Sequence, residues 1–219
     1  MLAQLLRFSR RPSAIVILLA LVPWMSLCAE EGVDQEREIT SLWQKTDPLI
    51  DFKVGYFFFS SESLRKVYKS GGYDLQLSAS YPVWKGLHVY GSLEFLSLSG
   101  NSLSEQEKTS LWQIPLSVGI KPIITICKQV QYYVTLGPRY FFLHQHNSSS
   151  YVPENISRSG LGGFVNTGFN FFPNKHLFFD LFGEFSYKRM HFPSSSGPVY
   201  GTTAQIGGFT LGAGAGYSF

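Results

Sequence analysis

The sequence has few charged residues, few cysteines and no long apolar segment beyond its first 30 residues. Asp, Glu, Lys and Arg make up 15% of the 219 residues, against about 25% in an average soluble protein. Aromatic residues reach 16%, which argues against intrinsic disorder because disordered chains are poor in them. No segment after residue 30 approaches the ~20 apolar residues of a membrane-spanning helix, so a polytopic helical membrane protein is excluded.

The chain also lacks a surplus of basic residues once its first segment is set aside. It holds 18 Lys and Arg against 15 Asp and Glu. Three of these bases, Arg7, Arg10 and Arg11, precede the apolar run of residues 14–22, and their removal leaves 15 basic and 15 acidic residues. Binding to nucleic acid depends on a surplus of Lys and Arg that contact phosphates, so no nucleic-acid partner is expected.

The first 29 residues have the three parts of a secretory signal peptide. A basic stretch is followed by the apolar run 14–22, and then by Pro23 and the short stretch 26–29. The run is too short to span a bilayer, which favours a cleaved signal over an anchor. We therefore predict a signal peptide at 1–29. If Cys28 is removed with it, Cys127 is left without a partner for an internal disulfide.

From residue 49 onward, apolar and polar residues alternate with the two-residue period of a β-strand. Residues 73–81 place Tyr, Leu, Leu, Ala and Tyr on one face, and Asp, Gln, Ser and Ser on the other. Eight such segments follow a polar, acid-rich leader at 30–48. Short and long connections alternate between them, which predicts antiparallel up-and-down topology. The short ones are 82–86, 125–128 and 173–175, and the long ones are 60–71, 99–110, 143–158 and 191–204.

The composition of the two faces predicts which face contacts lipid. The apolar faces carry large aromatic side chains, while the polar faces hold small residues such as Gly55, Gly119 and Gly137. An eight-stranded barrel has an interior just wide enough for side chains to fill. Segments of eleven or more residues exceed the average soluble strand and are long enough to cross a bilayer at a tilt. We therefore expect lipid outside and a polar lumen inside; a soluble barrel or sandwich with the faces reversed is the alternative.

The chain ends in Gly214-Ala-Gly-Tyr-Ser-Phe219, which resembles the C-terminal assembly signal of outer-membrane barrels. Gly214, Tyr217 and the terminal Phe219 carry this resemblance, although Gly212 stands where the signal usually begins with a polar residue. The whole of 49–219 resembles the small eight-stranded outer-membrane barrels of the outer-membrane protein A transmembrane-domain type. The resemblance implies an all-β, eight-stranded antiparallel up-and-down transmembrane barrel in the outer membrane of a Gram-negative cell. It also implies lipopolysaccharide as a neighbour, barrel-assembly machinery and periplasmic chaperones as partners in biogenesis, and a periplasmic leader at 30–48.

Nine charged residues fall on the faces that are expected to point inward. Five acids and four bases in a narrow barrel are expected to pair, because an unpaired buried charge is costly. We interpret them as a structural network that closes the lumen; a gated pore for small solutes is the alternative. The nine are Asp51, Lys53, Asp74, Glu94, Lys121, Arg139, Asp180, Glu184 and Lys188.

Little in the sequence indicates catalysis or metal binding. His146 and Ser148 have the His-x-Ser spacing of some lipid A deacylases, but a Ser-rich connection produces that spacing easily by chance. His144 and His146 lack the cysteine or acid that would complete a metal site. We predict no enzyme, no cofactor and no metal. The expected role is structural, or the binding of an extracellular ligand by the long outer loops; a pore is second and a lipid A-modifying enzyme third.

Overall fold

The computed structural model describes residues 47–68, 71–101, 108–147, 155–194 and 197–219. The predicted signal peptide at 1–29 and most of the leader at 30–48 lie outside these residues. Within the described ranges, no helix is long and apolar enough to cross a membrane.

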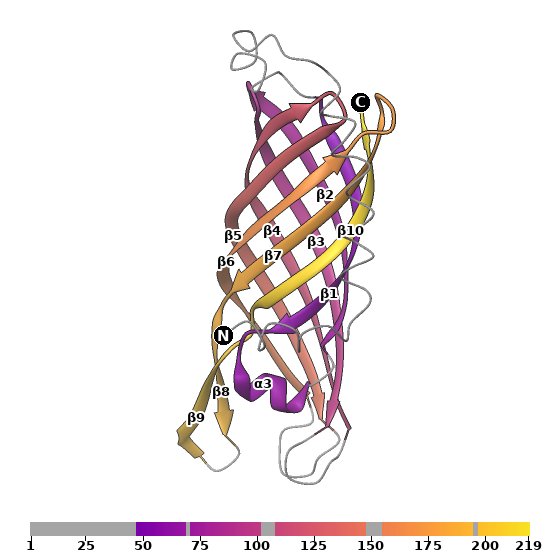
Figure 1. Cartoon of the computed structure of the whole chain (residues 1–219). Helices are drawn as coiled ribbons and strands as arrows, with labels where there is room; N and C mark the ends of the chain where they lie inside the picture. The colour runs from indigo at the N-terminus through magenta and orange to yellow at the C-terminus, as the bar shows by residue number, and fades with distance from the viewer. Residues whose placement is uncertain (1–46, 69–70, 102–107, 148–154, 195–196) are drawn as a thin grey trace, which may run out of the picture. The chain divides into compact units, whose positions relative to one another are not determined.

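Eight strands form one closed barrel in which neighbours in the chain are neighbours in the wall (Figure 1). All pairs are antiparallel, and the last strand of the chain closes the barrel against the first. This arrangement confirms the predicted eight-stranded up-and-down barrel. Its strands are β1 (Leu49–Phe59), β2 (Gly72–Trp84), β3 (Leu87–Asn101), β4 (Lys108–Cys127), β5 (Val130–Asn147), β6 (Asn155–Phe171), β7 (Leu177–Tyr187) and β10 (Gly208–Ser218).

The short connections and the C-terminus share one end of the barrel, which we call the turn end (Figure 1). Residues 85–86 join β2 to β3, residues 128–129 join β4 to β5, and residues 172–176 join β6 to β7. Gly86 has a φ of 64°, a left-handed conformation that glycine adopts without steric cost. The opposite end carries the longer connections and is called the loop end.

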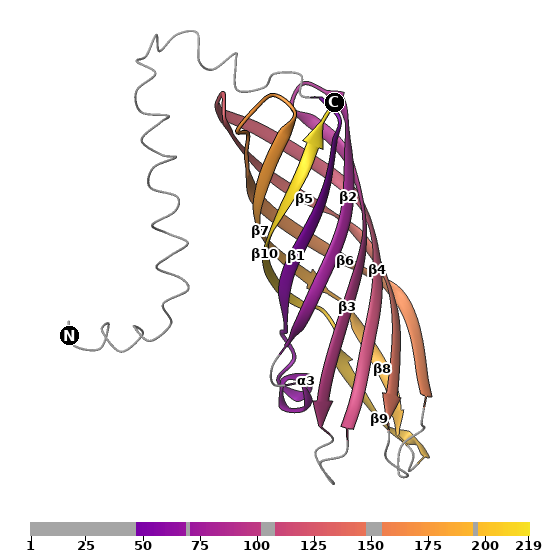
Figure 2. The ribbon, with the colours of Figure 1, turned by 90° about the vertical axis from the view of Figure 1, so that its right-hand side faces the viewer.

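The central strands continue well beyond the length that a bilayer requires. β4, β5 and β6 contain 20, 18 and 17 residues, against about 9–11 for a spanning strand. Figure 2 shows β3 and β4 continuing past the end of β1 at the loop end. The connections predicted at 99–110 and 143–158 are therefore shorter than expected, because strands extend into both. His144 and His146 accordingly lie in β5 and not in a loop.

Two small elements occupy the loop end. The six-residue helix α3 (Glu62–Val67) lies in the connection between β1 and β2. β8 (Arg189–Ser194) and β9 (Gly197–Gln205) pair as a separate two-stranded sheet between β7 and β10. The prediction of a loop at 191–204 is therefore wrong; the prolines and serines of this segment obscure its two-residue alternation.

The outward positions of the barrel strands form an apolar belt. Leu77, Leu93 and Val118 are each more than half exposed, while polar inward neighbours on the same strands are buried. Exposed apolar area on this scale requires a lipid environment. The predicted faces agree with this pattern, with two exceptions. Val130, the first residue of β5, and its pairing partner Phe171, the last residue of β6, are buried although they were expected to face lipid.

Candidate functional site

Three charged side chains meet across the barrel interior and form what we call the Arg139 cluster. Arg139 of β5 donates from Nη2 to Glu94 of β3 and from Nη1 to Glu184 of β7, both at 2.5 Å. Its Nε donates to Ser117 Oγ at 2.8 Å. All four residues are buried. The planar guanidinium, with five donors in a fixed fork, is suited to holding two carboxylates at once.

Uncharged side chains complete the cluster. Gln76 Nε2 donates to Glu94 Oε1 at 2.8 Å, and Ser92 Oγ donates to the same oxygen at 3.1 Å. Asn166 Nδ2 donates to Glu184 Oε2 at 3.1 Å. The sequence pattern does not distinguish these three partners from other inward residues, although each occupies an inward position in the alternation of its strand. Asn166 thus satisfies Glu184 Oε2, which the arginine leaves unpaired, whereas Gln76 and Ser92 add to Glu94 Oε1, the oxygen that the arginine also binds.

A second group, the Lys53 cluster, surrounds the side-chain ammonium group of Lys53 in β1. Lys53 Nζ is 2.5 Å from Asp180 Oδ2 and 3.7 Å from Asp51 Oδ2. It also donates to Tyr133 Oη at 3.0 Å, and that hydroxyl donates to Asp180 Oδ2 at 2.8 Å. Ser78 Oγ donates to Asp51. The tyrosine thus bridges the cation and its carboxylate, which sequence reasoning had not anticipated.

Three of the nine predicted charged residues lie outside both clusters. Asp74 is buried and accepts a hydrogen bond from Thr210 Oγ1 at 3.2 Å. Lys121 is also buried; its Nζ lies 4.1 Å from the centroid of the Tyr133 ring and has no hydrogen-bond partner within the described chain. An ammonium group over an aromatic face gains a cation–π attraction that offsets part of this cost.

Lys188 requires a correction to the predicted network. Its Nζ donates to the main-chain oxygen of Leu161 in β6 at 2.8 Å and reaches neither cluster. The alternation that placed Lys188 in the lumen ends with β7 at Tyr187. The chain leaves the barrel wall there, so Lys188 lies beside the edge of β6 at the loop end.

An apolar plug fills the interior on the loop-end side of the two clusters. Leu96 and Leu98 follow Glu94 along β3, and Phe141 and Leu143 follow Arg139 along β5. The prediction of a small and polar interior is therefore wrong for this end of the barrel. The interior at this end is packed with large apolar side chains, like that of a soluble protein. The plug comprises Phe57, Phe59, Tyr68, Leu96, Leu98, Leu111, Phe141, Leu143, Met190 and Ile206.

Helix α3 covers this plug. Leu64 and Val67 pack against it, and the Tyr68 hydroxyl lies 3.5 Å from Thr109 Oγ1. Burial raises the pKa of the Tyr68 phenol, so its hydroxyl stays neutral in this apolar setting. A Cβ on Gly100 would lie 2.5 Å from the Val67 oxygen, so glycine permits the close approach of α3 to β3. The loop end of the interior is thus closed by packed side chains.

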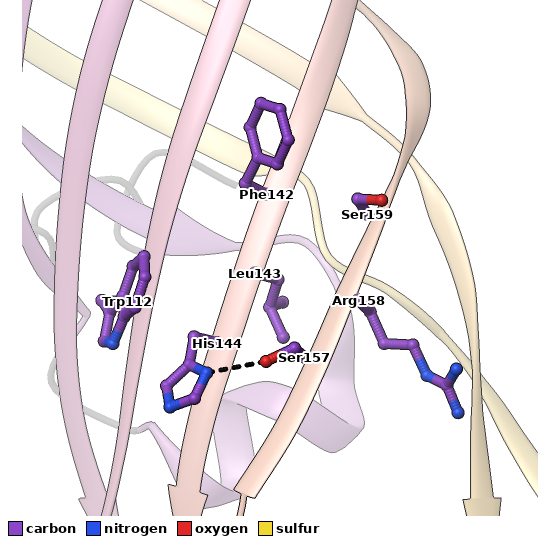
Figure 3. Close-up of a pocket in the computed structure, with 7 residues that line it drawn as sticks. All are labelled: Trp112, Phe142, Leu143, His144, Ser157, Arg158 and Ser159. Carbon is purple, nitrogen blue, oxygen red and sulfur yellow. Dashed lines mark hydrogen bonds between the residues drawn. The ribbon is translucent and has the colours of Figure 1, made fainter.

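A groove of about 330 Å³ lies on the outer wall, between β4, β5 and β6 (Figure 3). His144 Nδ1 is 2.8 Å from Ser157 Oγ, and the rings of Trp112 and His144 are 5.0 Å apart. No carboxylate lines this groove, so the histidine lacks the acid that orients the base in a catalytic triad. The predicted His-x-Ser pair includes Ser148, which lies outside the described residues.

The described residues contain no group of three His, Cys, Asp or Glu that is placed to hold a metal ion. At the turn end, Tyr217 of β10 is outward and 41% exposed, and its ring is 5.3 Å from that of Phe219. The Phe219 amide donates to Pro48 O at 3.1 Å. Gly214 lies against Lys53, whose Cγ would be 2.8 Å from an added Cβ. Gly214 and Tyr217 of the predicted assembly signal thus belong to the closing strand β10, and Phe219 directly follows the last residue of that strand.

Comparison with solved structures identifies the fold. OprG from Pseudomonas aeruginosa matches with a TM-score of 0.61 and 15% identity, over 80% of this chain and 97% of that one. Neisserial surface protein A matches with a TM-score of 0.51 and 15% identity, over 78% of this chain and 97% of that one. AlkL, solved in lipid bilayers, matches with a TM-score of 0.51 and 13% identity, over 81% of this chain and 92% of that one. The chain matches no protein-family model, and no curated protein matches it in sequence.

The sequence identities to these structures are well below 25%, so the similarity concerns the fold alone. The fold of the chain is that of the small eight-stranded outer-membrane β-barrels, as the sequence predicted. This fold and the apolar belt together place the barrel in an outer membrane.

Proposed function

We propose that this outer-membrane barrel is closed to solutes, and that it acts as a structural or binding protein through the surface it presents at its loop end. The observation that carries the proposal is the filled interior. Two ion-pair clusters cross the lumen, and the apolar plug under α3 lies between them and the loop end. Neither an enzyme nor a pore is needed to account for the six charges of the two clusters, because these charges are held by one another.

The proposed orientation follows from the even number of strands. Both ends of an even-stranded barrel lie on the same side of the membrane, and short turns of such barrels face the periplasm. We therefore assign the turn end, with the leader at 30–48, to the periplasm after cleavage of the signal peptide 1–29. The loop end, with α3 and the β8–β9 hairpin, faces the exterior and is where an extracellular ligand binds.

We expect the purified barrel to produce no stable single-channel openings in a planar lipid bilayer. The side chains that fill the lumen leave no continuous aqueous path. Recordings at several voltages in symmetrical salt test this expectation. Stable openings of reproducible size and selectivity would contradict the proposal of a closed barrel and would favour the alternative, a narrow pore for small solutes. That alternative draws support from Lys121 and Asn170, whose buried polar atoms have no hydrogen-bond partner among the described residues.

Deletion of Phe219 is expected to reduce the amount of assembled barrel in the outer membrane at least fivefold. We propose that the assembly machinery reads the last strand, and Phe219 supplies the terminal aromatic ring of that strand. The measurement is fractionation of the envelope, followed by gels of boiled and unboiled samples, in which a folded barrel migrates faster when unboiled. A matched deletion is not available inside β10, so Phe219→Tyr serves as the control and should assemble normally. Equal assembly of the deleted and intact chains would contradict a role for the ending.

A further inference from the structure

The seam between β6 and β7 opens at the loop end and leaves a strand edge unpaired. The pairing of the two strands stops at Gly163 and Tyr187, although β6 continues beyond this point and remains paired with β5. The register of β6 and β7 would place Arg189 of β8 opposite Leu161, but β8 pairs with β9 alone. No strand of the described chain therefore pairs with residues 155–162 on this side.

The main chain of β6 offers donors and acceptors along this edge. In an antiparallel sheet, the N–H and C=O groups of one residue point to the same side, and successive residues alternate between the two sides. The Leu161 oxygen faces the edge, because Lys188 donates to it from Nζ at 2.8 Å. Ser159 and Ser157 follow in the same alternation, so their N–H and C=O groups face the edge as well. Lys188 covers only the first of these three positions, which leaves the two serines to pair with an added strand.

The β8–β9 hairpin is held by the apolar plug and not by β6. Met190 of β8 and Ile206, which follows β9, belong to the plug, and the Ile206 amide donates to Lys188 O at 2.9 Å. The Lys188 side chain fills the seam where it begins to open, since its Nζ is 2.8 Å from the position that a Cβ on Gly160 would take. Figure 1 shows the hairpin diverging from the barrel wall at the loop end. The edge of β6 is therefore left to a strand from another molecule.

The charges around the edge indicate the chemistry of that strand. Arg158 and Arg189 are exposed and Lys188 is partly exposed, and none of the three forms an ion pair with a described acid. Figure 3 shows the Arg158 side chain directed away from His144. A second copy of this edge would bring like charges together, which is unfavourable, whereas carboxylates would be attracted. The charges thus favour an acidic strand over a second barrel.

We propose that this edge binds an extended acidic segment of another protein at the cell exterior, which pairs with β6 as an additional antiparallel strand. In this mode of recognition, main-chain hydrogen bonds supply affinity and alternate side chains supply specificity. The added strand pairs with the main chain of Ser157 and Ser159. Its carboxylates lie on the face of the sheet that carries Arg158, because opposite residues of paired strands share a face. This inference rests on the proposed function, since it specifies the ligand of the loop end.

The probe is a fluorescent eight-residue peptide in which Glu alternates with Thr, titrated against the full barrel in phosphatidylcholine nanodiscs. A matched peptide carries methyl groups on the main-chain nitrogens of its Thr residues, which removes the donors that face β6 and leaves the charge unchanged. We expect saturable binding of the first peptide and at least tenfold weaker binding of the second. Equal binding of both would overturn the proposal, because it would show attraction by charge without strand pairing. Absence of saturable binding of the first peptide would overturn it as well.

Two pairs of variants test the edge from the side of the barrel. Ser159→Pro removes an N–H group that faces the edge, and it should weaken binding at least tenfold, whereas Ser159→Ala should bind within twofold of the unaltered protein. Arg158→Gln with Arg189→Gln should also weaken binding at least tenfold. Its control of equal charge is Lys85→Gln with Lys175→Gln, which alters exposed lysines at the turn end and should bind within twofold.

Unaltered binding by Ser159→Pro, or an equal loss in both charge variants, would contradict strand addition at β6. Gels of unboiled samples show which variants fold. If Ser159→Pro does not fold, the two peptides on the unaltered barrel still decide the question. Nanodiscs expose both ends of the barrel, so the result does not depend on its orientation in the cell. Channel recordings test the closed lumen separately, and failure of the peptide to bind would leave that proposal standing.

Discussion

Replacement of Arg139 by methionine is expected to lower the free energy of unfolding by about 3–5 kcal/mol, the usual cost of breaking a buried ion pair. The methionine fills much of the same volume but donates no hydrogen bond. Glu94 and Glu184 would then face each other across the lumen, each without the cation that binds it at 2.5 Å. The measurement is urea unfolding in detergent micelles, followed by the fraction of protein that migrates as the folded form on unboiled gels.

A charge-balanced variant separates the effect of the buried charges on stability from the effect of side-chain packing. Arg139→Met combined with Glu94→Gln and Glu184→Gln leaves no buried charge in the Arg139 cluster, and it should recover most of the lost stability. Replacement of a buried ionic group by neutral side chains of similar size is often close to neutral for stability. A loss below about 1 kcal/mol in the single variant would be typical of solvent-exposed ion pairs. It would show that water reaches the cluster, and it would weaken the case for a closed lumen.

Replacement of Gly137 by valine is expected to prevent the barrel from closing, so that no fast-migrating band appears on unboiled gels. A Cβ at this position would collide with the Val118 main-chain oxygen of β4 and lie 2.6 Å from Gly119 Cα. The atoms it meets belong to the backbone of the neighbouring strand, which cannot move without losing the pairing between β4 and β5. Forced overpacking in a well-packed site typically costs 1–3 kcal/mol even where side chains can adjust, and the cost is larger here.

Gly91→Val is the matched control for this experiment. Gly91 is also a strand glycine, but the nearest atom to an added Cβ is the Ser117 oxygen at 3.9 Å, which is an ordinary contact. This variant should fold as the unaltered protein does and show the same shift on boiling. Normal folding of Gly137→Val would mean that β4 and β5 separate more easily than their spacing indicates. Failure of both variants would point to a general need for small residues in the wall.

Sequence patterns predicted the architecture because alternation of two residues assigns a side of the sheet to every side chain. Asp51, Lys53 and Asp74 were expected inside, and all three are buried there. Alternating short and long connections predicted the order of strands around the barrel. The ends of the strands at the loop end were less well predicted, because strands that extend past the bilayer no longer show an apolar face toward lipid there. The plug residues Phe57 and Phe59 were missed for another reason: they lie on either side of the outward Phe58, and three phenylalanines in a row obscure which rings face the interior.

The sequence by itself determined that this chain forms strands, which side of each strand carries charge, and that the wall is continuous. Only the tertiary structure decided which charges meet. Arg139 finds Glu94 and Glu184 on two strands that are not its neighbours in the wall, each 45 positions away in the chain. The same period of two places Lys188 inside, yet Lys188 lies at an edge. The physical reason is that alternation defines direction only, whereas the stagger between strands and the point where each one leaves the wall set the height of every side chain in the barrel.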